Sequence, residues 1–279
     1  MIYSFDDIVT RLCSENISSP RLEARMMLAY ILGCDASQVQ PSQINLSAEQ
    51  QTILDDMLEQ RLEHKPLCKI LGTKSFYKYD FIVSEDVLSP RPDTEILVEA
   101  AIDLGKQFPI HKILDMGIGS GCILLSLLGD LPAAVGTGID ISANALEIAR
   151  KNAKRLGLSE RCRFFQSSWF SERIDYGENF DLIVSNPPYI PTKDISGLDP
   201  EVKFYDPLTA LDGGEDGLRD YCRIAAIAPT LLSDDGFLLL ECGDGQSGEV
   251  IKIFMSTGLE LVDVRKDLSG KDRCIILKK

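Results

Sequence analysis

The fold class follows from one segment, Lys112-Ile113-Leu114-Asp115-Met116-Gly117-Ile118-Gly119-Ser120-Gly121. Its first half is a hydrophobic run typical of a buried strand, and its second half is a glycine-rich turn that opens a helix at 122–128. Such a turn lets the backbone approach a ligand closely, as in nucleotide-binding folds. Glycines also serve packing alone in many strand-to-helix turns. The spacing G-x-G-x-G, instead of G-x-G-x-x-G, makes a dinucleotide site a poorer fit.

The alternation of strand and helix continues to the end of the chain. We expect further strands at 134–139, 162–165, 180–185 and 236–241, a closing strand pair at 259–264 and 273–277, and helices at 143–156, 218–232 and 248–257. Strands that alternate with helices form a mainly parallel sheet covered on both faces. The sequence therefore predicts an α/β fold.

The N-terminal region, residues 1–72, is expected to form a small helical bundle. Ser19 followed by Pro20 predicts a helix start with Ser19 as its N-cap. Apolar residues recur at Leu22, Met26, Ala29 and Tyr30 with helical spacing, which predicts an apolar face of this helix. Ser47 and Gln50 have the spacing of a capping box at the start of another helix. The residues of this region do not reveal its function.

The aromatic and β-branched residues of 73–90 predict a β-hairpin that links the helical region to a third region, 91–279. Between them stands Ser89-Pro90-Arg91-Pro92-Asp93-Thr94-Glu95, followed by a helix to about residue 107. Two prolines fix the backbone around Arg91, so its guanidinium would point in a defined direction. An ordinary proline-rich linker explains these residues equally well.

The composition narrows the class of protein. The 279 residues are 44% hydrophobic and 26% charged, which is ordinary for a globular protein. A formal net charge of −14 argues against sequence-independent binding to DNA or RNA. No apolar run approaches the roughly 20 residues of a membrane span, and the acidic N-terminus resembles neither a signal nor a transit peptide. Eight scattered cysteines without a C-x-x-C pair, and only two histidines, argue against a metal site such as zinc and for reduced thiols in the cytoplasm.

Asn186-Pro187-Pro188-Tyr189 directly follows the strand expected at 180–185. Open α/β sheets bind their ligands at the carboxyl ends of strands. The Asn186 side chain can accept a hydrogen bond from an amino group, and the prolines stiffen the loop while leaving its carbonyls free to face a ligand. These residues fit a site for a planar –NH2 group. The alternative is a proline-rich turn that only ends the strand.

Asp140 directly follows the strand expected at 134–139, about twenty residues after the glycine turn. A carboxylate at that place can accept hydrogen bonds from both hydroxyls of a ribose. The glycine turn, Asp140 and the Asn186–Tyr189 loop together imply a nucleoside cofactor whose reactive end meets an amino-group substrate.

With these motifs the chain resembles the class I S-adenosylmethionine-dependent methyltransferases, and among them the release-factor glutamine N5-methyltransferases (the HemK/PrmC group). N-P-P-Y alone is shared with N6-adenine methyltransferases of nucleic acids. The narrower resemblance rests on further segments: 89–95, similar to P-R-P-[DE]-T-E, then 166–170, 206–218, 241–246 and 267–273, with the helical region ending at 65–72. It covers nearly the whole chain and implies a Rossmann-like domain with a mainly parallel seven-stranded sheet, joined by a β-hairpin to a helical substrate-docking domain.

The chain departs from the family pattern at a few positions. Met116 and Ile118 replace the usual Leu and Thr, which a loop that binds through its backbone tolerates. Ser168 stands where the family has an Asp that reaches the adenine amino group, so adenine recognition would use the Ser168 hydroxyl, or Trp169 and nearby backbone. Asp206 replaces a Glu.

The resemblance implies methyl transfer from S-adenosylmethionine to the glutamine of the Gly-Gly-Gln motif of class I release factors, with S-adenosylhomocysteine as product. The expected catalytic residues are Asn186, Pro187 and Tyr189: two carbonyl oxygens accept the N–H groups of the target amide, and the ring packs on its plane. Pro188 and Arg91 join these as expected substrate-binding residues. The expected cofactor-binding residues are Asp115, Gly117, Ile118, Gly119, Gly121, Asp140, Ile141, Ser168, Trp169 and Asn186.

Three alternatives compete with this interpretation. An N6-adenine methyltransferase of nucleic acids would have to flip a base into the site and hold the strand, which the charge of −14 disfavours. A cofactor-binding protein without activity is disfavoured by the intact N-P-P-Y segment. A dehydrogenase leaves the prolines unexplained. We expect a cytoplasmic, monomeric enzyme whose partner is the release factor, without a membrane or nucleic-acid partner.

Overall fold

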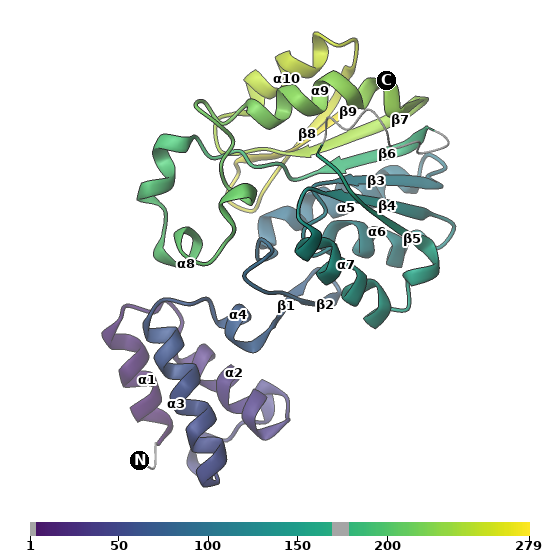
Figure 1. The fold of residues 1–279 in the computed structure, drawn as a ribbon. Helices are drawn as coiled ribbons and strands as arrows, with labels where there is room; N and C mark the ends of the chain where they lie inside the picture. The colour runs from purple at the N-terminus through teal and green to yellow at the C-terminus, as the bar shows by residue number, and fades with distance from the viewer. Residues whose placement is uncertain (1–3, 169–178) are drawn as a thin grey trace. The chain divides into compact units, whose positions relative to one another are not determined.

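The computed structural model describes residues 4–168 and 179–279, which divide into two compact units (Figure 1). The helical unit consists of Met1–Gly72 together with Asp199–Tyr205. The sheet unit consists of Thr73–Leu198 and Asp206–Lys279. The sequence pattern gave no sign that the short segment Asp199–Tyr205 belongs with the helices. Trp169, expected at the cofactor, lies outside the described residues.

The helical unit is a bundle around a single apolar cluster. Its elements are α1 (Phe5–Ser14), α2 (Pro20–Leu32), η1 (Ala36–Gln38), η2 (Pro41–Gln43), α3 (Ala48–Leu62), α4 (Leu67–Leu71) and α8 (Pro200–Lys203). The predicted capping box of α3 is confirmed: the Ser47 hydroxyl accepts the Gln50 N–H at 3.2 Å, and the Gln50 side chain accepts the Ser47 N–H at 2.9 Å.

The predicted start of α2 at Ser19 and Pro20 is confirmed, but its cap and its buried face differ from the expectation. Ser19 makes no side-chain cap hydrogen bond, and its backbone (φ −133°, ψ 56°) is not the extended conformation of an N-cap. The helix buries Ala24, Met27, Leu28 and Ala29, whereas Leu22, Met26 and Tyr30 are exposed. The helix carries apolar residues on two faces. Packing against α1 and α3, which helical spacing alone does not specify, selects the second face.

The segment Asp199–Tyr205 is held in the helical unit by polar contacts. The buried Arg61 donates to Glu23 at 2.6 Å and to Glu201 at 2.5 Å, and also to the Lys65 carbonyl at 3.2 Å. The Tyr205 hydroxyl donates to the Glu63 carbonyl at 2.8 Å. Residues far apart in the sequence are thereby joined around one buried cation.

The sheet unit begins with the predicted hairpin, β1 (Thr73–Phe76) and β2 (Tyr79–Ile82), followed by the alternating elements. The large sheet comprises β3 (Lys112–Met116), β4 (Val135–Asp140), β5 (Cys162–Gln166), β6 (Phe180–Ser185), β7 (Leu232–Glu241), β8 (Glu260–Lys266) and β9 (Asp272–Lys278). The helices are η3 (Pro92–Thr94), α5 (Glu95–Gly105), α6 (Cys122–Asp130), α7 (Ala143–Arg155), η4 (Ser159–Arg161), η5 (Thr192–Gly197), η6 (Leu208–Ala210), α9 (Arg219–Leu231) and α10 (Ser247–Met255).

The seven strands have the order β5-β4-β3-β6-β7-β9-β8. The five strands from β5 to β7 are parallel, whereas β9 runs antiparallel to both β7 and β8. The expected mainly parallel seven-stranded sheet is confirmed. Successive strands lie to one side of β3 as far as β5, and the chain then crosses to β6 on the other side. The order therefore reverses between β3 and β6, where open sheets form a ligand crevice.

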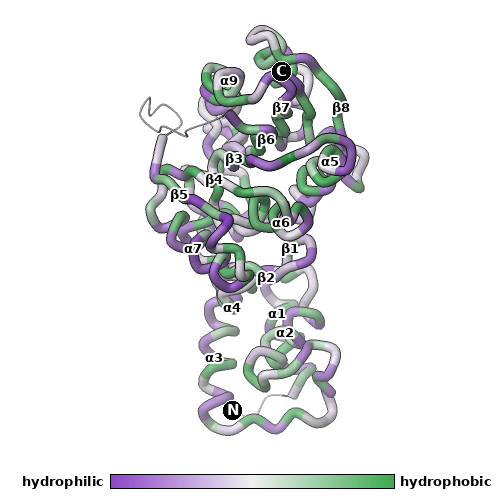
Figure 2. Tube along the Cα trace, turned by 90° about the vertical axis from the view of Figure 1, so that its right-hand side faces the viewer, coloured by the Kyte–Doolittle hydropathy of each residue, from purple (hydrophilic) through white to green (hydrophobic). Residues whose placement is uncertain are grey.

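Helices cover both faces of the sheet (Figure 1). Leu182 and Val184 of β6 pack into a core with α5, α6 and α7, and Ile183 between them packs into a second core with α9 and α10. Both faces of the central strands are thus buried, which explains why β6 reads as a continuous hydrophobic run. Hydrophilic and hydrophobic residues alternate along α7 in Figure 2, as expected for a helix with one buried face. Within the described residues, no helix has the length and apolar character that a membrane crossing requires.

Candidate active site

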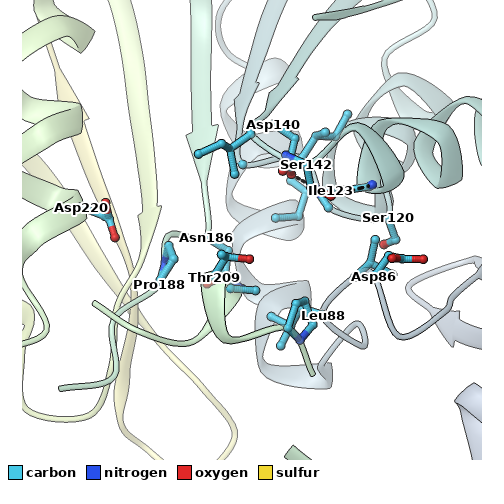
Figure 3. A pocket seen from close by; sticks show the side chains of 18 of the residues that line it. Asp86, Leu88, Ser120, Ile123, Asp140, Ser142, Asn186, Pro188, Thr209 and Asp220 are labelled. Atoms are coloured by element: carbon cyan, nitrogen blue, oxygen red, sulfur yellow. Dashed lines mark hydrogen bonds between the residues drawn. The ribbon is translucent and has the colours of Figure 1, made fainter. Parts of the chain in front are cut away.

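A cavity of about 250 Å³ opens at the carboxyl ends of β3, β4 and β6 (Figure 3). Its wall contains the predicted residues Arg91, Gly117, Ile118, Gly119, Asp140, Ile141, Ser168, Asn186 and Pro188. Residues not singled out from the sequence also line it, among them Leu88, Thr94, Thr209, Asp220 and Arg223. The reversal of strand order brings the glycine turn and the Asn186 loop to one cavity, although about 65 residues separate them in the sequence.

The glycine turn lies against the end of β4. The N–H groups of Gly117 and Ile118 both donate to the Ile139 carbonyl at 2.9 Å. Gly117 and Gly119 adopt φ values of 81° and 53°, which favour glycine. A Cβ at Gly138 would stand 2.1 Å from the Ile118 Cδ1, so a larger residue there would force the Ile118 side chain to move.

Asp140 stabilises the turn and still faces the cavity. Its two oxygens accept the Gly119 N–H and the Ser142 N–H, each at 2.9 Å. Burial raises the pKa of this carboxyl, and the backbone donors oppose the shift. Each carboxylate oxygen can accept a second hydrogen bond, so Asp140 retains the capacity to bind hydroxyl groups. Beside it the exposed side chain of Ile141 offers an apolar surface.

Two expected cofactor-binding residues do not reach the cavity wall. Asp115 is fully buried, accepts the Leu124 N–H at 3.3 Å and leaves its Oδ1 without a hydrogen-bond partner. Burial raises the pKa of Asp115 to about 7. Gly121, with φ 83°, is the N-cap residue of α6. In this structure these residues shape the start of α6 behind the cavity.

The Asn186–Tyr189 loop is packed tightly from behind. Asn186 and Pro188 line the cavity, Pro187 is buried, and the Tyr189 ring packs against the core on the α9 side of the sheet. A Cβ at Gly217 would stand 2.4 Å from the Tyr189 carbonyl oxygen, and one at Gly213 would stand 2.8 Å from the Pro188 carbonyl oxygen. The glycines of the 206–218 segment therefore let that segment support the loop closely.

Thr94 and Glu241 are the functional candidates that sequence reasoning missed or left aside. The Thr94 hydroxyl donates to the Glu241 Oε2 at 2.5 Å and accepts from the Asn186 Nδ2 at 3.3 Å. The Tyr189 hydroxyl donates to the Glu241 Oε1 at 3.3 Å. Burial raises the pKa of Glu241, while the Thr94 hydrogen bond and the charges of Arg273 and Arg91 oppose the shift. Thr94 could have been found from the sequence, because it lies within the segment 89–95 that carries the family resemblance.

Arg91 and Ser168 both line the cavity. Arg91 lies near a carboxylate, whereas Ser168 forms a hydrogen bond with its neighbour in the sequence. The Arg91 guanidinium is 3.9 Å from the Asp206 carboxylate, and its side chain is 37% exposed, so it can reach a ligand. Asp206 also accepts the Ser89 N–H at 3.3 Å, so the shorter carboxylate still ties the two segments together. Ser168 is exposed, and its carbonyl accepts the Ser167 hydroxyl at 2.6 Å.

Both the N-terminal helical region and the sheet region match known protein families. Residues 92–197 match the family model described as "Methyltransferase small domain", and residues 5–72 match the "PrmC N-terminal domain". Among solved structures, the hMettl16 catalytic domain in complex with the MAT2A 3'UTR hairpin 6 superposes with a TM-score of 0.59 at 15% identity, covering 90% of this chain and 91% of that one. At this identity the likeness concerns the fold alone, and it agrees with the methyltransferase fold expected from the sequence.

Two curated relatives extend over almost the whole chain. The release factor glutamine methyltransferase of Rhodospirillum rubrum is 41% identical, covering 96% of this chain and 82% of the relative. The protein of the same name from Agrobacterium fabrum is 40% identical, covering 96% of this chain and 94% of the relative. The expected resemblance is confirmed, and the chain belongs to the release factor glutamine methyltransferase family.

Proposed function

We propose that this protein transfers a methyl group from S-adenosylmethionine to the side-chain amide nitrogen of the glutamine in the Gly-Gly-Gln motif of class I release factors. Family membership favours this substrate. The observation that carries the proposal is the cavity itself, which has the glycine turn and Asp140 on one part of its wall and Asn186 on another. One cavity can therefore hold a nucleoside cofactor and an amide together.

The residues of the cavity fit the cofactor. Asp140 has acceptor capacity for two ribose hydroxyls, Ile141 offers an apolar face for a base, and the turn at Gly117 and Gly119 has no side chains to obstruct close approach. When bound, S-adenosylmethionine supplies an electrophilic methyl group. Ser168 would contribute a hydroxyl near the base.

The acceptor end of the site must orient a poor nucleophile, because the lone pair of an amide nitrogen is delocalised into its carbonyl. The Asn186 Oδ1 and the Pro187 carbonyl oxygen would accept the two N–H groups of the substrate amide. They would thereby orient the nitrogen and stabilise positive charge as it develops. The Tyr189 ring does not line the cavity in this structure. Its packing on the plane of the substrate amide is therefore a prediction that rests on the family resemblance. Arg91 would contact the substrate at the cavity wall.

An N6-adenine methyltransferase of nucleic acids would use the same loop. The net charge of −14 disfavours a strand-binding surface, and the family membership favours a protein amide. A release-factor substrate also implies action in the cytoplasm, where translation takes place. The eight cysteines are all free thiols, which is consistent with a reducing compartment. We propose that the protein acts as a monomer.

The decisive experiment measures methyl transfer from radiolabelled S-adenosylmethionine to a purified class I release factor. The parallel samples contain a release factor with Ala in place of the Gln of its Gly-Gly-Gln motif, and duplex DNA. Label on the wild-type factor alone is expected. Equal label on the Ala variant, or label on DNA, would overturn the substrate assignment.

A further inference from the structure

Three side chains at the acceptor end of the cavity, of which Asn186 and Thr94 line its wall, form a series of hydrogen bonds. Asn186 Nδ2 lies 3.3 Å from Thr94 Oγ1, and Thr94 Oγ1 lies 2.5 Å from Glu241 Oε2. Thr94 and Glu241 are 3% and 1% exposed, so bulk water does not compete for these bonds. This series of hydrogen bonds begins at Asn186 in the cavity wall and ends at the buried carboxylate of Glu241.

The tertiary fold brings these three side chains together from separate elements. In the parallel pairing of β6 with β7, Ser185 lies opposite Leu240, so the next residues, Asn186 and Glu241, reach the same edge of the sheet. Thr94 comes from the turn before α5. A Thr at a helix start ordinarily caps the helix with its hydroxyl, but the Thr94 side chain makes no cap hydrogen bond and points to Glu241 instead.

The chemistry of the three groups fixes the direction of each bond. A carboxylate only accepts, and a hydroxyl has a single hydrogen to donate. The Thr94 hydrogen is therefore used on Glu241, at a distance typical of a hydroxyl that donates to a charged oxygen. Thr94 Oγ1 can then only accept from Asn186, which must turn its NH2 group toward Thr94 and keep its Oδ1 for another partner.

We propose that Thr94 and Glu241 are positioning residues, which hold the Asn186 amide in the orientation that presents its Oδ1 to the substrate N–H. The inference rests on the proposed function and adds two residues to its site. Without the Thr94 hydroxyl the amide can rotate by half a turn and present its NH2 group to the substrate. A donor would then face a donor, and the target amide would lose its acceptor.

A matched pair of substitutions separates this role from packing. Thr94→Val keeps the shape and removes the hydroxyl, whereas Thr94→Ser keeps the hydroxyl and removes the methyl group. We expect Thr94→Val to lower kcat on the order of ten- to hundredfold with little change in cofactor affinity, and Thr94→Ser to stay within about threefold of wild type. An active Val variant, or Val and Ser variants impaired to the same degree, would overturn the proposal.

Glu241→Gln tests whether the carboxylate acts through Thr94. The double variant Glu241→Gln/Thr94→Val should be no slower than the slower single variant, because both changes break the same series of hydrogen bonds. Independent, multiplicative losses would contradict a shared series. The double variant also avoids leaving a buried carboxylate with the Tyr189 hydroxyl as its remaining donor, so it guards against failure of Thr94→Val to fold.

A readout without substrate keeps this inference distinct from the proposed function. In ¹H–¹⁵N spectra the side-chain NH2 signals of Asn186 can be identified by their loss in Asn186→Ala. We expect these signals to shift in Thr94→Val and to remain near their wild-type positions in Thr94→Ser. Unchanged signals in Thr94→Val would overturn the positioning role. Absence of label on a release factor with wild-type enzyme would instead overturn the proposed function.

Discussion

Each unit of this protein buries a charged side chain, and the two charges are compensated differently. In the helical unit Arg61 is 1% exposed, and its guanidinium contacts the carboxylates of Glu23 and Glu201. In the sheet unit Glu241 is also 1% exposed, but its side-chain hydrogen bonds come from hydroxyls, those of Thr94 and Tyr189. Within the described residues, Glu241 forms no ion pair, and the nearby Arg273 is paired with Asp93 and Asp267 instead.

The difference separates a structural charge from a functional one. Burying a charge costs free energy unless partners replace the lost water, and a carboxylate with only neutral donors is less well compensated than an ion pair. The Arg61 cluster holds Asp199–Tyr205 to the bundle. The less compensated Glu241 orders a residue of the cavity wall. A fold tolerates such a cost where the arrangement serves the reaction.

The largest expected effect on stability comes from breaking the Arg61 cluster. Arg61→Met leaves the carboxylates of Glu23 and Glu201 without their cation and should destabilise the helical unit by about 2–3 kcal/mol, because both carboxylates keep some contact with water. Denaturant unfolding followed by circular dichroism measures this change. The variant Arg61→Met/Glu23→Gln/Glu201→Gln should recover much of the loss. A loss below about 1 kcal/mol in Arg61→Met would mean that the cluster behaves like an exposed ion pair.

The largest expected effect on catalysis comes from Asn186, which the hydrogen bonds through Thr94 connect to Glu241. Asn186→Ala removes the acceptor for the substrate amide and should lower kcat by about 10²–10³-fold, as for the loss of one electrostatic donor or acceptor in an active site. Calorimetric titration should show nearly unchanged affinity for S-adenosylmethionine, and Arg61→Met should not share this pattern. A variant that keeps near-wild-type turnover would refute the role of Asn186.

A smaller effect is expected from Asp115, a buried acid of the sheet unit with a single backbone donor. Burial raises its pKa from 3.8 to about 7, so the folded state binds the proton more tightly than the unfolded state. Its contribution to stability is therefore present at low pH and is lost as the pH rises through about 7. Between about pH 5 and 8 the free energy of unfolding of the wild-type protein should therefore fall by on the order of 2 kcal/mol because of this group. In Asp115→Asn this part of the pH dependence should be absent. Unfolding curves that keep the wild-type pH dependence would contradict this prediction.

The smallest expected effect compares two serines of the helical unit. Ser47→Ala removes a cap that the structure shows and should cost about 1 kcal/mol. Ser19→Ala removes a hydroxyl without a cap hydrogen bond and should change the free energy of unfolding by less than about 0.5 kcal/mol. Equal losses in thermal or denaturant unfolding would show that local sequence, not the observed cap geometry, sets the stability of these helix starts.

Much of the fold was predictable because its signals are local. The hydrophobic runs at 112–116 and 180–185 coincide with β3 and β6, and the capping box of α3 needs only residues three positions apart. The motif residues that follow strands, such as Gly117, Asp140 and Asn186, meet at one cavity because parallel strands end at one edge. The buried face of α2 was not predictable in this way, because its choice depends on which helices pack beside it.

The sequence alone determined the α/β class, the family resemblance and several of the residues that line the cavity, among them Gly117, Asp140 and Asn186, since these follow from periodicity and from short motifs. Only the tertiary structure decided that Asp199–Tyr205 joins the helical unit and that Asp115 lies behind the cavity. It also decided that Thr94 lies between Asn186 and Glu241 and forms a hydrogen bond with each, although Thr94 and Glu241 are 147 residues apart in the chain. A hydrogen bond requires two atoms about 3 Å apart in space, and no local pattern records a distance between residues that only folding brings together.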